Sequence, residues 1–497
     1  MLEFMKPVVR ALPVLLLSAI VAGCALGPSY QRPEETLPPQ FAAAQDAAYR
    51  GNEAVPGRFW TVFGDDVLSR LIEDSLESNH DVRIAAARLR EARALRRDAG
   101  FDLLPTVNGR ASRIKSKQSA DSLPGLPPEA LETNLYDAGF DATWELDIFG
   151  NTRAYQAARA DLGSALASLD DAFVTLASEV ARNYLEMRGL QNRYEVAKRN
   201  SGNQRSTFDL TRVRLDGGRG TELDVARAEA QLATTAATLP QLEAAIARSQ
   251  YRLEVLTGHR PGELTAELVA QPMGKLPQFT PVGDAREWLR RRPDVRIAER
   301  NLAAATARIG VAVADLFPKV SLIGSFGWNA ADRDDIGKGA TETWRYGPSI
   351  SWAIFDLGHV QARISAARAR ADGALAVYEQ TVLRALEDTE GSLVAYSRAL
   401  ASEAALTQAA DASGKASRLA RLRFDGGVAD FLEVLDAERV LLDAEDRLAQ
   451  SRADSATALV AVYKALGAGW QDIESPHMPA RTAAASSSAA ASSSAAR

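Results

Sequence analysis

The sequence has little cysteine, little histidine and no excess of positive charge. Its 497 residues include one cysteine, Cys24, and four histidines that stand far apart. One thiol cannot form an internal disulfide, and scattered histidines lack the spacing of a metal-binding motif. The 58 basic and 64 acidic side chains are interspersed, whereas a nucleic-acid-binding protein carries a basic stripe. We therefore expect no metal site and no nucleic-acid partner.

The sequence also lacks the motifs of common catalytic sites. It contains no nucleophile elbow, no phosphate-binding loop and no His-Glu-x-x-His helix. Carboxylate pairs are abundant, but in long exposed helices they are expected as solvated charge. We expect neither an enzyme nor a bound cofactor.

Long apolar runs are confined to the first 24 residues. Lys6 and Arg10 precede the apolar segment 11–22, which is too short to span a bilayer as a helix but has the length of a secretory h-region. The segment ends in Val-Ala-Gly-Cys at 21–24, which resembles a bacterial lipobox. We expect residues 1–23 to be a lipoprotein signal peptide and Cys24 to be lipidated; an ordinary signal peptide with a chance cysteine is the alternative. No later segment approaches 18 consecutive apolar residues, so we expect any further membrane crossing to consist of strands.

The rest of the chain is a tandem duplication. Asp-Val-Arg-Ile at 81–84 returns at 294–297, and Arg-x-Arg-x-Asp-Gly-Gly at 212–218 returns at 421–427. A period of this length is far beyond that of a solenoid, so it indicates a doubled half-molecule. We divide the chain into the leader, a lipidated extended segment, two repeats and an alanine- and serine-rich tail that we expect to be disordered. Their bounds are 1–23, 24–65, 66–270, 271–470 and 471–497.

Each repeat has the same predicted order of helix, two strands, very long helix, tight turn and helix. Segments 153–216 and 359–425 carry apolar residues at spacings of three and four, which predicts long helices that pack as coiled coils. Shorter helices are expected at about 66–100, 221–257, 285–315 and 430–467. Two of them end to end are long enough to run beside one long helix.

Four segments alternate as strands do, at about 106–115, 136–148, 318–329 and 344–356. From Tyr136 to Ile148 the even positions are apolar or aromatic and the odd positions are mainly polar or acidic. This pattern is typical of a transmembrane barrel strand, although a half-buried soluble sheet has the same period. The secretory leader favours the membrane interpretation. Four strands cannot close, so chains must join: two copies would give a filled barrel, and three would give a lumen lined by the acidic odd-numbered face.

The turns after the long helices, at about 212–224 and 421–436, form the expected tips. Both contain Asp-Gly-Gly, in which glycine permits the left-handed residue that closes a helix. Glu433 and Asp436 stand three residues apart on one face of the following helix. Acidic side chains at this position either line an opening or simply interact favourably with the dipole at the start of the helix. The nearby arginines either close the tip by ion pairs, meet a partner protein or are ordinary surface residues.

Together these features resemble the outer-membrane factor family, the TolC-like exit ducts of bacterial efflux and secretion systems, in its lipoprotein branch. The lipobox, Gly-Pro-Ser-Tyr-Gln-Arg-Pro at 27–33, Phe-Trp-Thr-Val-Phe-Gly-Asp at 59–65, Arg-Arg-Pro-Asp-Val at 291–295 and the paired tips carry the resemblance. It implies an α+β membrane protein: a homotrimer whose twelve-stranded transmembrane barrel continues into a periplasmic α-helical barrel. It also implies a passive exit duct that carries drugs or other toxic small molecules from an inner-membrane pump and a periplasmic adaptor across the outer membrane.

The resemblance further implies roles for the tip residues. The carboxylates Asp436, Glu433, Glu222 and Asp224 would surround the periplasmic aperture, although Arg227 stands where the second repeat has Asp436. The residues that would face the adaptor are Arg212, Arg214, Gly217, Gly218, Arg421, Arg423, Gly426 and Gly427. The residues themselves leave one alternative open, a lipid-anchored periplasmic coiled-coil scaffold.

Overall fold

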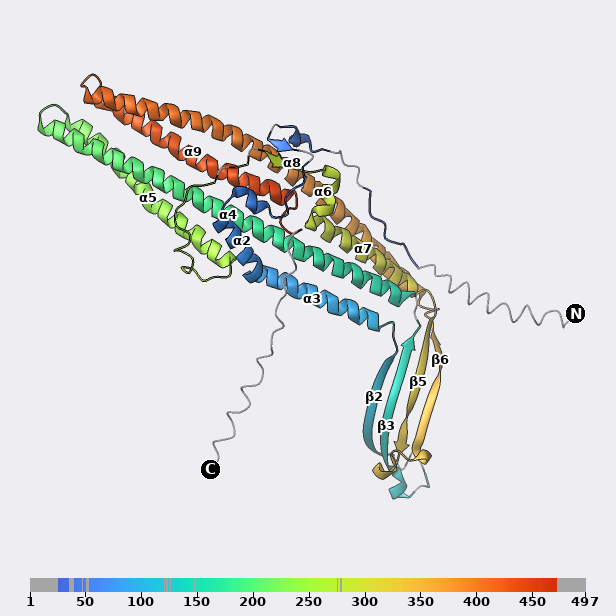
Figure 1. Ribbon diagram of the computed structural model, residues 1–497. Helices are drawn as coiled ribbons and strands as arrows, with labels where there is room; N and C mark the ends of the chain where they lie inside the picture. Colours follow the sequence, from blue (N-terminus) through green and yellow to red (C-terminus); the bar gives the residue numbers. More distant parts are fainter. Residues whose placement is uncertain are drawn as a thin grey trace, which may run out of the picture.

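A computed structural model of the chain describes residues 26–34, 40–46, 48–50, 53–119, 121, 124–125, 127–146, 149–274, 276–277 and 279–471. Cys24 and the tail beyond Gln471 lie outside the described residues. Figure 1 shows an elongated molecule, in which a layer of helices ends in two hairpin turns and a sheet projects from the opposite end. No helix among the described residues has an apolar stretch long enough to cross a bilayer.

The two repeats fold into matching series of elements. The first comprises α2 (Asp66–Ser78), α3 (His80–Phe101), β2 (Thr106–Lys117), β3 (Glu132–Glu145), α4 (Gly150–Asp216) and α5 (Glu222–Leu256). The second comprises α6 (Ala285–Arg291), α7 (Pro293–Ala314), β5 (Lys319–Ala330), β6 (Glu342–Ser351), α8 (Leu357–Asp425) and α9 (Phe431–Ala465).

The helices expected at 66–100 and 285–315 are each two helices, so this prediction is wrong. Asn79 is extended (φ −64°, ψ 137°), caps α3 with its side chain and donates to the Leu256 carbonyl oxygen at 2.9 Å. Arg292 at the matching break precedes Pro293, which disfavours helical backbone in the residue before it. The Arg292 guanidinium donates to the Ala465 carbonyl oxygen at 3.0 Å. In both repeats the residue at the break is therefore polar, and its side chain binds the end of the last helix of that repeat.

The long helices α4 and α8 run the length of the helical layer (Figure 1). Near the sheet, α4 packs against α3 and α7, and towards the tips it packs against α5 and α9. Helices α7 and α9 lie between α4 and α8, one following the other along the layer. The long helices thus link the sheet to the tips with continuous rods.

The core is centred on the middle of the layer, where Trp60, Trp288 and Tyr463 are fully buried. Phe59 stacks on Tyr463 with ring centroids 5.5 Å apart. The segment 24–65, expected to be extended, also contains the 3₁₀ turns η1 (Ala42–Gln45) and η2 (Phe59–Phe63) and the short strand β1 (Tyr49–Arg50), which pairs with β4 (Thr280–Pro281). The expectation is wrong for the two 3₁₀ turns, because burial of Phe41, Phe59 and Trp60 folds the segment onto the core, whereas β1 is extended.

The four long strands form one antiparallel sheet in the order β2-β3-β5-β6. The strand expected at 136–148 runs over Glu132–Glu145, and the one expected at 344–356 runs over Glu342–Ser351. Pairing with β2 extends β3 through Thr133 and Asn134, where the backbone ladder continues although apolar alternation has not yet begun. Asp147 and Ile148 of the expected strand lie outside the described residues.

Candidate functional site

One face of the sheet exposes large apolar side chains. On this face lie the even-numbered residues of β3, β5 and β6, because the register pairs Phe140 with Phe326 and Phe326 with Trp344. Trp344 is 64% exposed, Ile350 69% and Tyr346 79%. A contiguous exposed apolar surface of this kind marks contact with lipid or with another protein.

The opposite face of the sheet is mainly polar. Arg110 of β2 forms ion pairs with Asp137, at 2.6 Å, and with Asp141, both of β3. Ser321, Ser325 and Asn329 of β5 lie on the same face, as do Thr143, Thr343, Ser349 and Ser351. An apolar face opposite a polar face is the arrangement of a barrel strand that separates lipid from a water-filled lumen.

At the far end of the layer, the tip of the second repeat is held by its own side chains. Helix α8 ends at Asp425, and Gly427 rather than Gly426 takes the left-handed conformation, with φ 72°. Asp430 caps α9 by accepting from the Glu433 backbone N–H at 3.2 Å. Phe424, Phe431 and Val434 form a small buried cluster beneath the turn.

Both acids predicted at the second tip are paired with arginines. The Glu433 carboxylate lies 3.2 Å from Arg423, and the Asp436 carboxylate lies 3.0 Å from Arg439 on the same helix. All four side chains are largely exposed. In this chain the two acids therefore carry charge at the surface of the tip, but each is partly compensated.

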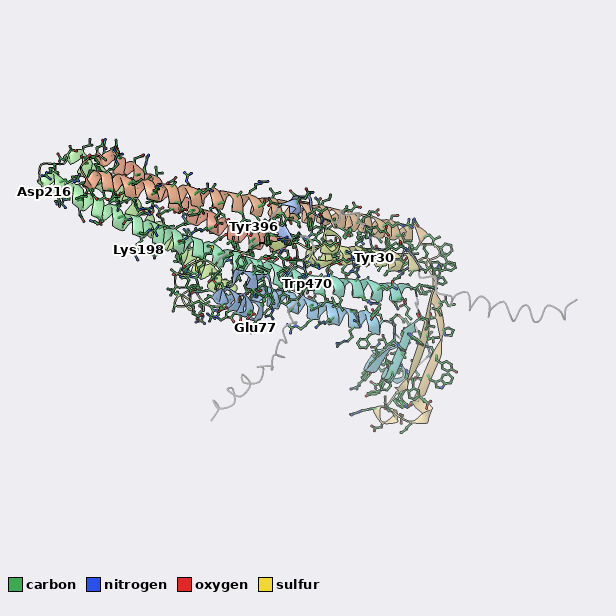
Figure 2. All side chains as sticks on the ribbon, turned by 45° about the horizontal axis from the view of Figure 1, so that its top comes forward. Tyr30, Glu77, Lys198, Asp216, Tyr396 and Trp470 are labelled. Atoms are coloured by element: carbon green, nitrogen blue, oxygen red, sulfur yellow. The ribbon has the colours of Figure 1, made fainter. Side chains whose placement is uncertain are left out.

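The turn at the first tip has the same conformation, and the first tip contacts the second. Gly218 is left-handed, with φ 70°, and Thr221 caps α5 by accepting from the Asp224 backbone N–H. Arg214 donates to the Phe424 carbonyl oxygen at 2.9 Å and lies 3.8 Å above the Phe424 ring centroid. Figure 2 shows Asp216, the last residue of α4, at the end of the molecule farthest from the sheet. The two tips thus lie side by side at one end and contact each other through Arg214.

Glu438 is a tip residue that we did not single out from the sequence. It is 5% exposed, lies 2.6 Å from the Arg421 guanidinium and accepts from the Thr207 hydroxyl at 3.0 Å. Phe431, Val434 and Glu438 follow each other at spacings of three and four, which places the acid on the buried face of α9. That spacing is the signal that could have revealed it.

Comparison with known proteins decides the family. The family model described as "Outer membrane efflux protein" matches residues 71–259 and 285–468, one range in each repeat. The chain belongs to this family. The solved outer-membrane channel OprN is 43% identical, with a TM-score of 0.85 over 90% of this chain and 100% of that chain.

Two related outer membrane efflux proteins align with this chain over nearly their whole length. OprJ of Pseudomonas aeruginosa is 30% identical over 466 residues, which are 92% of this chain and 95% of that protein. The solvent efflux pump outer membrane protein SrpC of Pseudomonas putida is 30% identical over 474 residues, 93% of this chain and 98% of that protein. The similarity therefore covers sheet, layer and tips together.

Membership of the family establishes the activity. The chain is an outer-membrane channel of a tripartite efflux system, with its helical part in the periplasm, and it is a channel rather than an enzyme. Members of the family form trimers and act with a periplasmic adaptor and an inner-membrane pump. The coiled-coil scaffold considered from the sequence is thereby set aside.

Proposed function

We propose that three copies of this chain join their sheets edge to edge into one twelve-stranded transmembrane barrel. The contrast between the two faces of the sheet carries the proposal, because a membrane barrel needs an apolar outer face and tolerates a polar inner one. Strands β2 and β6 are the edges of the four-stranded sheet, and an unpaired edge is costly in lipid. Twelve strands leave an open lumen, which the polar face with Asp137 and Asp141 would line, whereas eight do not.

The chain is also proposed to be anchored by lipid at Cys24. Arg153, in the first turn of α4, donates to the carbonyl oxygens of Leu26 at 2.9 Å and Gly27 at 3.2 Å. Gly27 packs so closely on Gly310 of α7 that a Cβ atom would lie 2.8 Å from the Gly310 Cα. These contacts hold the backbone two residues after Cys24 at the sheet end of the helices, where an acyl chain can enter the membrane.

At the other end, the aperture is proposed to be surrounded by carboxylates. Glu433 and Asp436 of the second tip, together with Glu222 and Asp224 of the first, lie at the start of the helices that follow the turns. A threefold axis through this end would turn each acid into a ring of three. Such a ring attracts cations and repels anions.

The adaptor is proposed to bind the outside of the same tips. Arg421 is occupied by Glu438, Arg423 by Glu433 and Arg214 by Phe424, so these arginines shape the tip. Arg212 contacts only the Phe208 ring of its own helix, at 5.8 Å, among the contacts of the described residues. Arg212, the glycine turns at 217–218 and 426–427, and Arg423, which is exposed although it is paired, are therefore the parts that a partner can reach.

The cargo is proposed to be drugs or other toxic small molecules, carried passively from an inner-membrane pump to the exterior. Support comes from relatives, among them SrpC, whose name describes a solvent efflux pump, and TtgI, whose name describes a toluene efflux pump.

Planar-bilayer recording tests the proposed duct. Purified full-length protein should insert and give discrete, cation-selective single-channel currents. Preparations that contain folded protein but conduct no current above the lipid background would contradict the proposal.

A further inference from the structure

The apolar face of β2 changes character along the strand. The register places the odd-numbered residues of β2 opposite the even-numbered residues of β3, on the face with Phe140. Near the helices these β2 residues are small or apolar, and near the loop they are all basic. In order they are Val107, Gly109, Ala111, Arg113, Lys115 and Lys117.

Side-chain contacts confirm that the three cations share this face. The Arg113 guanidinium lies 5.4 Å from the centroid of the Tyr136 ring. Lys115 and Lys117 lie 3.0 Å and 3.5 Å from the same carboxylate, that of Glu132. Within the described parts of the chain, no carboxylate comes within ion-pair distance of Arg113. The cluster of Arg113, Lys115 and Lys117 therefore keeps an excess of positive charge on the apolar side of the sheet.

The tryptophans at the other end of the face give the depth of this basic cluster in the membrane, because aromatic girdles mark the edges of the apolar band of a barrel. The indoles of Trp144 and Trp352 donate to the carbonyl oxygens of Leu103 at 3.1 Å and Leu316 at 3.0 Å, beside the helices. At about 3.4 Å per residue and a tilt of about 40°, Tyr136 lies roughly 20 Å above Trp144 along the barrel axis. The apolar band of such barrels is about 25 Å tall. Arg113 thus lies at the edge of the band, and the two lysines lie beyond it, at the level of lipid headgroups.

An apolar groove lies deeper on the same face. Phe140, Phe326, Trp344 and Tyr346 line it, and a Cβ atom added to Gly324 at its floor would have no atom within 4 Å. The groove lies four residues nearer the helices than Tyr136, or about 10 Å deeper in the membrane at the same tilt. That separation suits an acyl chain below a phosphate-bearing headgroup.

We propose that the basic cluster binds the phosphate groups of phosphorylated lipids in the outer leaflet. The proposal rests on the proposed membrane barrel, because only that placement turns this face towards lipid. The two lysines share one carboxylate and Arg113 has none among the described residues within ion-pair distance, so the three cations complement a phosphate electrostatically. The groove beneath them favours a lipid over free phosphate. A basic residue near a charged lipid surface strengthens binding by about 1 kcal/mol, or roughly fivefold.

Equilibrium binding of lipid A in mixed micelles to purified full-length protein tests the proposal. The probes are the diphosphorylated form and the same lipid after enzymatic removal of both phosphates. Lys115→Gln should weaken binding of the diphosphorylated form about fivefold, and replacing Arg113, Lys115 and Lys117 together by Gln should weaken it by on the order of 100-fold. Binding of the dephosphorylated lipid should be the same for wild type and variants.

Lys338→Gln is the matched control. Lys338 lies in the connection between β5 and β6 at the same end of the sheet, pairs with one carboxylate, and its side chain is 61% exposed, against 62% for Lys115. It should bind the diphosphorylated lipid as wild type does. An equal loss in Lys338→Gln, no loss in the triple variant, or full displacement by inorganic phosphate at equal ionic strength would overturn the proposal. Channel currents recorded from the same preparations distinguish failure of the lipid site from failure of the duct. Wild-type protein that conducts, but binds the diphosphorylated and dephosphorylated lipids equally, would contradict the lipid site alone.

Discussion

At the scale of single residues, the charged side chains of the two tips make different contacts. In the second repeat Glu438 is buried and holds Arg421, whereas Glu229, the matching acid of the first repeat, is exposed. Arg214 of the first tip instead binds Phe424 of the second. The hairpin of α8 and α9 is therefore braced internally, and the hairpin of α4 and α5 rests against it.

The acids proposed to surround the aperture are paired with arginines, and this pairing determines the expected effect of removing them. In the variant with Glu433→Ala and Asp436→Ala, Arg423 and Arg439 lose their carboxylate partners. Three copies would then present uncompensated arginines at the narrow end, so cation selectivity should fall and block by trivalent cations should weaken. Reversal potentials in a salt gradient measure the first effect, and titration with a trivalent cation measures the second.

Asp443→Ala is the control for these acids. Asp443 lies two turns further along α9 and is likewise exposed and paired with an arginine of its own helix, Arg447. It should change the reversal potential much less than Asp436→Ala does. Equal effects at both positions, or none at either, would mean that Glu433 and Asp436 serve only the start of the helix.

Asp171 gives a prediction for the pH dependence of stability. Burial raises its pKa, and the nearby Asp294 carboxylate raises it further, against the opposing charges of Lys464 and Arg292. The folded protein therefore binds this proton more tightly than the unfolded chain, and the contribution of Asp171 to stability falls as the pH rises through the raised pKa. Asp171→Asn should raise the thermal midpoint at pH 7, and the gain should vanish well below about pH 4, the ordinary aspartate value. A lower midpoint at pH 7 would show that the charged form stabilises the fold.

At the scale of elements, periodicity predicted the long helices because apolar spacing persists through them. The break at Asn79 was missed because it depends on one polar residue and its hydrogen bond to a distant helix end. The break at Arg292 has a local signal, the proline that follows it, which the apolar periodicity does not register. The first residues of β3 were missed because their pairing with β2 is a backbone ladder with no apolar pattern. The Arg214–Phe424 contact joins different repeats, so no local pattern could indicate it.

The two faces of the sheet make a prediction for the strands. Phe140→Arg places a charge on the apolar face and should cost about 2–4 kcal/mol if the residue lies near the membrane midplane, so less assembled protein should be recovered from membranes. Thr143→Arg lies on the polar face and should be much milder. Quantitative recovery of heat-modifiable oligomer on gels compares the two. Equal losses would refute the assignment of the faces.

At the scale of the whole molecule, each of the two repeats supplies two strands to the sheet at one end and one hairpin tip at the other. Gly258 and Gly467 have positive φ values of 78° and 69° at matching joints after α5 and α9, where each lies against the break in the paired helices of its own repeat. The same joint is therefore present in both repeats, and the sheet and the tips lie at opposite ends of the two long helices, α4 and α8, which have similar lengths. Since the described part of the chain supplies four strands to this sheet, closure of the proposed barrel would have to come from other copies.

Native mass spectrometry of the detergent-extracted, unheated protein tests whether three copies of the chain close one barrel. We expect a single dominant species with three times the mass of the mature chain, and heating should convert it to a species with the mass of one chain. A dominant monomer or dimer in preparations that still give channel currents would contradict it.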